Sequence, residues 1–352
     1  MSTDLLLALQ EAHAFDPFPV RDDLGIYHVP FSELAGDGHI EQTLGDGCRR
    51  YERVAIVGDS GTGKSSLTAS VLGPLAEGVA PVVVPVAIEP NETVSEPRAM
   101  FAHIAAVIAR VAADAAALSS TEREQALARL TSQRPVGRVG GRSLRLGGGW
   151  MGANLSAELA MQAGPPQVME RSAAETLEVV EQMLATVHGE GLVPVLVFDD
   201  TDRWLSGSFR EHGDLARSFF GRVLPALAGL HCSVVVAVHR RYLADDTLGA
   251  DIERVLETVI EVPPLRDTDA VGAVLQSRLH AHRPDGDAAT LADLIAADAI
   301  DRLFELYRTG LRGELRGVLR MAHVALAEAC DSGADMITAP LIDAAHAAWD
   351  SA

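Results

Sequence analysis

Two hydrophobic patterns alternate along the first 265 residues, and together they predict a sheet of buried strands connected by helices. Five runs are continuously apolar and rich in valine and isoleucine, as expected for parallel strands covered on both faces: Val54–Val57, Val82–Ile88, Val193–Phe198, Ser233–Val238 and Val259–Val262. Between them, apolar residues recur at helical spacing in Ser65–Leu75, Pro97–Leu118, Arg171–His188 and Leu215–Ala228. This alternation predicts an α/β fold, a three-layer sandwich around a parallel sheet.

The strand pattern ends at Arg266, and the remaining sequence predicts helices alone. The helical stretches are Asp267–His282, Ala288–Thr309, Glu314–Cys330 and Ala339–Trp349. At the other end of the chain, MSTDLLLALQEAHAF is predicted to form an amphipathic helix and lacks the basic start of a signal peptide. We therefore expect a lead-in over residues 1–47, an α/β core over 48–265 and a helical domain over 266–352.

One segment of the core, residues 129–161, departs from the strand and helix rhythm. Leu144 and Leu146 alternate with polar neighbours, as do Leu155 and Leu159, and a glycine cluster separates the two stretches. This pattern predicts an inserted β-hairpin. The segment carries five arginines without an acidic residue before Glu158: Arg129, Arg134, Arg138, Arg142 and Arg145.

The candidate chemistry begins directly after the first strand, where residues 58–66 read GDSGTGKSS. The stretch fits G-x-x-x-x-G-K-S, the phosphate loop that joins a strand to a helix. Its glycines let backbone N–H groups approach phosphates, and the dipole of the following helix adds positive potential. Lys64 would reach the β- and γ-phosphates, and the Ser65 hydroxyl would bind Mg²⁺. The expected nucleotide-binding residues are Gly58, Asp59, Ser60, Gly61, Thr62, Gly63, Lys64, Ser65 and Ser66.

A second motif, VPVLVFDDTDRW, starts at Val193 and places carboxylates at the end of an apolar strand. The carboxyl ends of parallel strands form the edge where α/β sheets bind ligands. Asp199 would hold Mg²⁺ through water, and Asp200 would polarise the attacking water. The side chain of aspartate is about one methylene shorter than that of glutamate. Asp200 would therefore reach less far toward the attacking water, and we expect slow hydrolysis. Asp202 would cap the following helix.

Composition and charge limit which compartment and which classes of partner we expect for this chain. The chain has 352 residues, a formal net charge of −20 and a pI near 4.9, so its surface disfavours nucleic-acid backbones and membranes. Cys48, Cys232 and Cys330 lack the spacing of a zinc site or a disulfide framework. The most apolar window, Val71 to Ile88, contains Glu77 and prolines, so no membrane span is expected. These features favour the cytoplasm.

With both motifs in place, the chain resembles the AAA+ ATPases and their STAND relatives, especially the branch of the origin-recognition initiators. The resemblance implies a P-loop core followed by a helical lid. It places His239 and Arg240 where relatives sense the γ-phosphate, although histidine departs from the usual polar residue. It makes Arg254 a finger offered to a neighbour's ATP, and a helix-surface ion pair explains Arg254 equally well. In Gly313-Glu314-Leu315-Arg316 it assigns Arg316 to the phosphates, with Arg312 and Arg320 on neighbouring turns as the alternatives.

These expectations leave three uses of a bound nucleotide open: hydrolysis as fuel, control of a switch, and donation of a phosphoryl group. The last of these is disfavoured. A phosphoryl donor needs an acceptor pocket, whereas this chain devotes its length to a lid and a hairpin. We expect an Mg²⁺·ATP-dependent ATPase with slow hydrolysis that switches self-assembly or engagement of a partner protein. The alternative is a DNA-associated initiator or transposition-type ATPase, with DNA contacted by the arginines of residues 129–145. A third interpretation is an interaction protein that retains nucleotide without hydrolysing it.

Overall fold

The computed structural model describes residues 2–19, 23–73, 78–84, 97–115, 134–135, 168–169, 172–189, 191–202, 215–284 and 288–350. The chain divides into two compact units. One, here called the sheet unit, comprises Asp46–Ile56 and Leu75–Val259. The other, here called the loop-and-lid unit, comprises Met1–Gly45, Val57–Pro74 and Ile260–Ala352. The three domains expected from the sequence remain a prediction.

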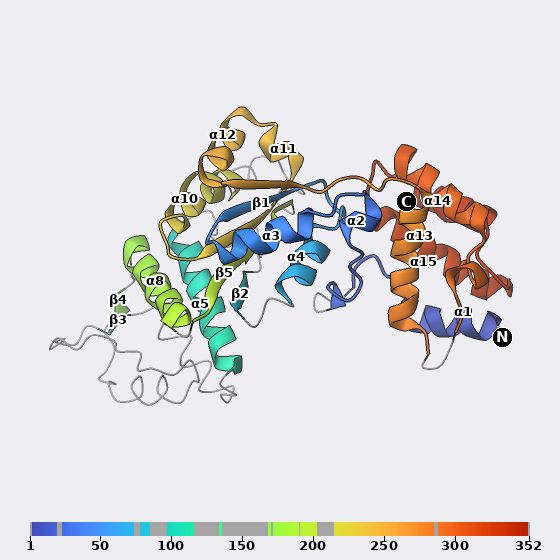
Figure 1. Ribbon diagram of the computed structural model, residues 1–352, viewed down its shortest axis with the longest axis horizontal. Coiled ribbons are helices and arrows are strands. Elements are labelled where there is room, and N and C mark those ends of the chain that lie inside the picture. Colours follow the sequence, from blue (N-terminus) through green and yellow to red (C-terminus); the bar gives the residue numbers. More distant parts are fainter. Residues whose placement is uncertain are drawn as a thin grey trace. The chain divides into compact units, whose positions relative to one another are not determined.

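A five-stranded sheet has the order β2-β5-β6-β1-β7, and three of its strands, β1, β2 and β5, are labelled in Figure 1. The strands are β1 (Arg53–Val57), β2 (Val79–Val84), β5 (Val193–Phe198), β6 (Ser233–Val238) and β7 (Thr258–Glu261). β2 pairs in parallel with β5, and β5 pairs in parallel with β6, with Leu196 opposite Val82 and Val234. Every residue of β6 is buried, as its continuous valine run predicts. The expected parallel α/β sheet is confirmed, and residues 85–88 of the second predicted strand lie outside the described residues.

The helices of the sheet unit cover and connect these strands. They are α5 (Pro97–Ala115), α8 (Ala173–Gly189), a π-helical turn (Phe219–Val223), α10 (Leu224–Leu227), α11 (Arg240–Leu243) and α12 (Asp246–Val255). α5 packs against α8, and the two helices contact β2 and β5, respectively (Figure 1). The helices predicted over Pro97–Leu118 and Arg171–His188 correspond to α5 and α8, whereas α11 and α12 were not predicted from the sequence pattern.

The regular helix predicted over Leu215–Ala228 is wrong in its middle, where the π-helical turn interrupts it. The side chains of Phe219 and Phe220 are adjacent in sequence and both fully buried. Phe219 packs on Phe198, with 5.1 Å between ring centroids, and Phe220 packs on Tyr242 at 5.3 Å. The wider turn occurs where two consecutive aromatic rings are buried against different partners.

The predicted hairpin over residues 129–161 lies outside the described residues except for Arg134 and Pro135. These two residues form β3, which pairs antiparallel with β4 (Val168–Met169). The other four arginines of the segment are likewise outside the described residues.

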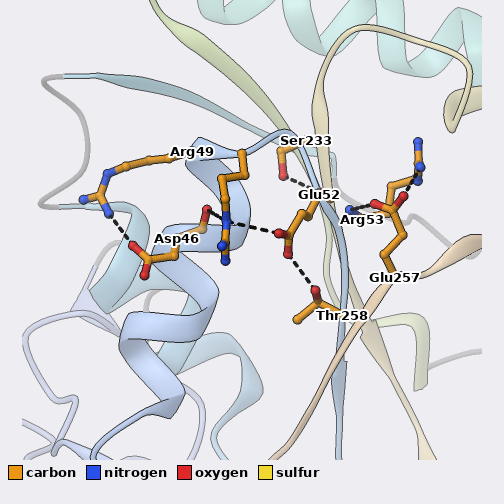
Figure 2. Close-up of polar contacts among 8 residues, drawn as sticks. Asp46, Arg49, Glu52, Arg53, Ser233, Glu257 and Thr258 are labelled. Carbon is orange, nitrogen blue, oxygen red and sulfur yellow. Dashed lines mark hydrogen bonds and ion pairs between the residues drawn. The ribbon is translucent and has the colours of Figure 1, made fainter.

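Polar side chains join β6, β1 and β7, which are neighbours in the sheet (Figure 2). Thr258 Oγ1 donates a hydrogen bond to Glu52 Oε2 at 2.6 Å, and Ser233 Oγ donates to the Glu52 carbonyl at 2.7 Å. Arg53 forms an ion pair with Glu257. Because β6 and β7 both connect to the start of β1, these bonds fix the amino ends of the three strands.

We expect Arg53→Ala to destabilise the sheet unit by about 1–3 kcal/mol, because the Arg53 guanidinium bonds two separate partners. Its Nη1 donates to the Ala228 carbonyl at 2.8 Å, and its Nη2 pairs with Glu257. Arg49→Ala is the matched control, since Arg49 pairs with Asp46 at 3.4 Å on the exposed face of a helix and is expected to contribute about 0–1 kcal/mol. Urea unfolding midpoints of the two variants test the difference, and equal midpoints would contradict it.

The loop-and-lid unit is helical. Its elements are α1 (Ser2–Glu11), α2 (Phe31–Leu34), α4 (Lys64–Leu72), α13 (Thr268–His282), a 3-10 turn (Leu291–Asp293), α14 (Ala297–Thr309), α15 (Leu315–Ser332) and α16 (Ala339–Asp350), and α3 (Ile40–Arg49) extends from it into the sheet unit. α1 packs on α15, and Leu5, Leu6 and Leu9 of α1 are buried, which confirms the predicted amphipathic helix. Of the helices in the described ranges, none combines the length and apolar character needed to cross a bilayer.

The single helix predicted over Ala288–Thr309 is wrong, because the chain leaves helical geometry between the 3-10 turn and α14. Ile295 forms an isolated parallel bridge with Ile337. Ala296 N–H donates to the Ile337 carbonyl at 2.9 Å, and Ile337 N–H donates to the Leu294 carbonyl at 2.8 Å. Both isoleucines are fully buried. A distant segment thus satisfies backbone groups that a continuous helix would have paired locally.

Candidate functional site

The loop between β1 and α4 has the backbone shape that its glycines predict. β1 ends at Val57, and α4 begins at Lys64. Gly61 and Gly63 have φ angles of +72° and +100°, in the left-handed region that side chains with a Cβ atom disfavour. Gly63 directly precedes α4 in this left-handed conformation. The loop therefore reverses direction and delivers the chain into the amino end of a helix, where anions bind.

Two of these glycines also stand where a larger residue would collide with its surroundings. A Cβ atom on Gly58 would lie 2.6 Å from Thr62 Oγ1, and one on Gly61 would lie 2.8 Å from the Arg316 Cβ atom. Thr62 Oγ1 itself donates to the Asp59 carbonyl at 2.9 Å. The compact loop is thus packed against its own residues and against the start of α15.

Lys64 places a buried cation beside this loop. Its side chain is 7% exposed, and Nζ donates hydrogen bonds to the carbonyls of Gly58 at 3.0 Å and Asp59 at 2.7 Å. It is also the only lysine in the chain. A buried ammonium group within reach of left-handed glycines fits the phosphates of a nucleotide.

The two serines after Lys64 differ in their surroundings. Ser65 lies half-buried in the first turn of α4. The hydroxyl of Ser66 donates to the Leu24 carbonyl at 3.1 Å and lies 3.3 Å from His28 Nδ1. Ser66 therefore ties α4 to the lead-in, and its expected contact with nucleotide remains a prediction, as do those of all the other residues of Gly58–Ser66.

The sequence assigned no chemical role to His28, because a single histidine in an irregular segment has no motif. Its Nε2 lies 3.1 Å from Glu41 Oε1, and the Phe31 N–H donates to the same oxygen at 2.8 Å. Burial lowers the pKa of His28, and the hydrogen bond and charge of Glu41 oppose that shift. The pair fixes the lead-in beside Ser66 and the phosphate-loop helix.

Arg316 lies where the helical C-terminal region meets the phosphate loop. It follows the first residue of α15, and its backbone N–H donates to the Gly61 carbonyl at 3.2 Å. The preceding turn contains Arg312 and Gly313, with φ angles of +52° and +78°. Within the loop-and-lid unit, the residue that the resemblance assigned to the phosphates therefore contacts the phosphate loop through its backbone.

The acidic motif follows β5 in the sheet unit. Asp199 is 4% exposed, and its Oδ1 accepts a hydrogen bond from the Asp200 N–H at 2.9 Å. Asp200 has a φ angle of +60°, a left-handed conformation that aspartate tolerates better than most residues with a Cβ atom. Asp200 and Asp202 are half-buried. The carboxylates of Asp199 and Asp200 thus leave the strand end in different surroundings.

The end of β6 is tied to this motif by two residues that the sequence analysis missed. Thr201 Oγ1 donates to the Ala237 carbonyl, and the Tyr242 hydroxyl donates to the Thr201 carbonyl at 2.8 Å. Thr201 is fully buried. Its only sequence signal is a polar residue directly after the two aspartates, and its partners are more than thirty residues away.

The residues assigned to γ-phosphate sensing and to the finger have identifiable partners in this chain. His239 is 8% exposed and caps α11, with Nδ1 accepting from the Arg241 N–H at 3.1 Å. Arg240 is the exposed first residue of α11. Arg254 pairs with Asp251 at 2.9 Å on the surface of α12, the arrangement that the ion-pair interpretation predicted. Action in trans remains a prediction for Arg254.

Within the sheet unit, the strand order relates the acidic motif to His239. β5 and β6 are neighbours in the sheet and are followed directly by Asp199 and by His239, respectively. A parallel α/β sheet presents such carboxyl-end residues at one edge, where ligands bind.

Comparison with known proteins adds a family match. Residues 38–236, more than half of the chain, match the family model described as AAA ATPase domain. No match is found among curated proteins.

Among solved structures, the chain is similar to Cdc6p from Pyrobaculum aerophilum, at 13% identity and a TM-score of 0.47, covering 89% of this chain and 67% of that one. It is similar to ORC1 of Aeropyrum pernix in complex with DNA, at 14% identity and a TM-score of 0.48, covering 94% of this chain and 70% of that one. It is also similar to ORC2 of Aeropyrum pernix in ADPNP–ADP complexes, at 14% identity and a TM-score of 0.49, covering 91% of this chain and 71% of that one.

Proposed function

The chain belongs to the AAA ATPase domain family, and from this premise we propose that it is an Mg²⁺·ATP-dependent switch whose nucleotide state controls self-assembly or engagement of a partner protein. One observation carries the proposal. The Arg316 N–H bonds the Gly61 carbonyl, so the long helix α15 begins on the loop that would hold the phosphates. A change in that loop on binding a triphosphate would act directly on the C-terminal helices.

The residues present fit the nucleotide and its metal ion. Lys64 and the backbone of Gly58–Gly63 would hold the phosphates, and the hydroxyl of Ser65 and the carboxylate of Asp199 are the hard oxygen ligands that Mg²⁺ prefers. The metal ion would neutralise charge that develops on the phosphates. The Asp200 carboxylate would orient a water and accept its proton.

Three features support a slow switch in preference to a fast motor. Asp200 carries a shorter side chain than glutamate and occupies a left-handed conformation. His239 uses Nδ1 to cap its own helix. Arg254 is held by Asp251. The DNA-associated alternative depends on Arg138, Arg142 and Arg145, which lie outside the described residues.

We expect a slowly hydrolysed ATP analogue with Mg²⁺ to convert the purified chain into a larger assembly, and ADP to leave its mass unchanged. Mass photometry at matched protein concentrations measures both states. Arg316→Ala should reduce the response to the analogue, because the helix would lose its charged contact with the terminal phosphate. An unchanged mass with analogue and with ADP would contradict control of self-assembly.

A further inference from the structure

Two arginines and two exposed aromatic rings form a cluster in the loop-and-lid unit. The Arg316 Cζ atom lies 5.1 Å from the centroid of the Phe18 ring. The Arg320 Cζ atom lies 5.9 Å from the same centroid and 4.3 Å from the centroid of the Trp349 ring. Arg316 and Arg320 are one helical turn apart on α15, so the Phe18 ring contacts both guanidinium groups.

The Phe18 side chain is not held in place by burial in the core. Its side chain is 59% exposed, one of the most exposed large apolar side chains in the described part of the chain. The backbone of Phe18 is held nonetheless, because its N–H donates to Asp16 Oδ1 at 2.8 Å. Both guanidinium groups lie within 6 Å of the centroid of the Phe18 ring, the range in which cation–π attraction acts.

Arg316 belongs to this cluster and to the edge of the phosphate loop at the same time. Its backbone is fixed by the bond to Gly61, and its Cβ atom occupies the space that a side chain at Gly61 would need. The guanidinium group, at the far end of a flexible side chain, is the part of Arg316 that can change partners. An exposed cation–π contact is weaker than a charge-assisted bond from arginine to phosphate.

We propose that the Phe18 ring binds the guanidinium group of Arg316 until a nucleoside triphosphate binds. The terminal phosphate then replaces the Phe18 ring as the partner of this guanidinium group. This inference rests on the proposed function, in which the phosphate loop binds ATP. Phe18 thereby reduces the fraction of molecules whose Arg316 is ready to bind phosphate, which weakens apparent triphosphate affinity by that fraction. A diphosphate lacks the terminal phosphate that would compete with Phe18 for Arg316. Phe18 therefore lowers the preference for ATP over ADP.

We expect Phe18→Ala to tighten binding of a slowly hydrolysed ATP analogue about threefold and to leave ADP affinity unchanged, as the loss of one exposed cation–π contact predicts. Isothermal titration calorimetry with Mg²⁺ measures both affinities on the full chain. Ile26→Ala is the matched control, since Ile26 is another exposed apolar residue of the lead-in, at 66% exposure. It should change neither affinity.

The same titration in an Arg316→Ala background tests whether Phe18 acts through Arg316. Phe18→Ala should then have no effect on either nucleotide, whereas in an Arg320→Ala background its effect on the ATP analogue should persist. Equal changes for ATP analogue and ADP, weaker analogue binding, no change at all, or an effect that survives without Arg316 would each overturn the proposal. Failure of the folded wild-type chain to bind either nucleotide would contradict the proposed function and this inference with it.

Discussion

Lys64→Ala is expected to abolish the stabilisation of the protein by Mg²⁺·ATP. At a free ligand concentration of about one hundred times the dissociation constant, binding alone should raise the free energy of unfolding of the wild-type chain by about 2.7 kcal/mol. The variant should show no shift, because the Lys64 ammonium is the buried cation beside the phosphate loop. Thermal unfolding with and without nucleotide measures the effect.

Ser70→Ala is the matched control for this experiment, because Ser70 lies on the same helix, α4, beyond the phosphate loop. It should keep the full ATP-dependent shift. A Lys64→Ala protein that gains as much stability from Mg²⁺·ATP as the wild type would show that the phosphates bind elsewhere.

Asp200→Asn should keep nucleotide binding and reduce turnover on the order of a hundredfold or more, the typical contribution of a general base. Asparagine preserves the size of the side chain and tolerates the left-handed conformation at φ +60°, so the fold of the turn should be retained. Steady-state phosphate release and equilibrium binding separate the two effects.

Asp202→Asn supplies the comparison, since Asp202 is a second half-buried carboxylate in the same turn. Normal turnover in Asp200→Asn, together with lost turnover in Asp202→Asn, would move the catalytic role to Asp202. Loss of nucleotide affinity in Asp200→Asn would instead indicate that Asp200 acts in binding.

The elements with strong local patterns could be predicted from the sequence. The valine-rich runs at β5 and β6 have the predicted bounds, because continuous burial on both faces leaves a continuous apolar signal. α1 was predictable because Leu5, Leu6 and Leu9 share one helical face. The turn before α4 was predictable because its glycines are required locally for the left-handed backbone at residues 61 and 63, and nucleotide binding there stays a prediction.

Features that depend on distant partners could not be predicted in this way. The break before α14 depends on backbone bonds from Ile337, and the π-helical turn depends on rings that pack against Phe198 and Tyr242. Neither partner is visible in the local periodicity of its helix.

The candidate site divides along the same line. The motifs of the sequence assigned Lys64 and Asp199, and the family resemblance assigned Arg316. The contact of Phe18 with Arg316, in contrast, joins residues almost three hundred positions apart. Thr201 and Tyr242 likewise connect strand ends through backbone carbonyls, which no residue pattern records.

The most direct test of phosphate binding by this loop uses the fact that Lys64 is the only lysine in the chain. Protein grown with lysine labelled with ¹³C at the ε-carbon should give a single lysine Cε signal in an NMR spectrum, which needs no assignment. Titration with Mg²⁺·ATP should move this signal to a new position, saturating at one nucleotide per chain. A folded protein whose lysine signal stays unchanged at high Mg²⁺·ATP concentration would contradict nucleotide binding at Gly58–Ser65.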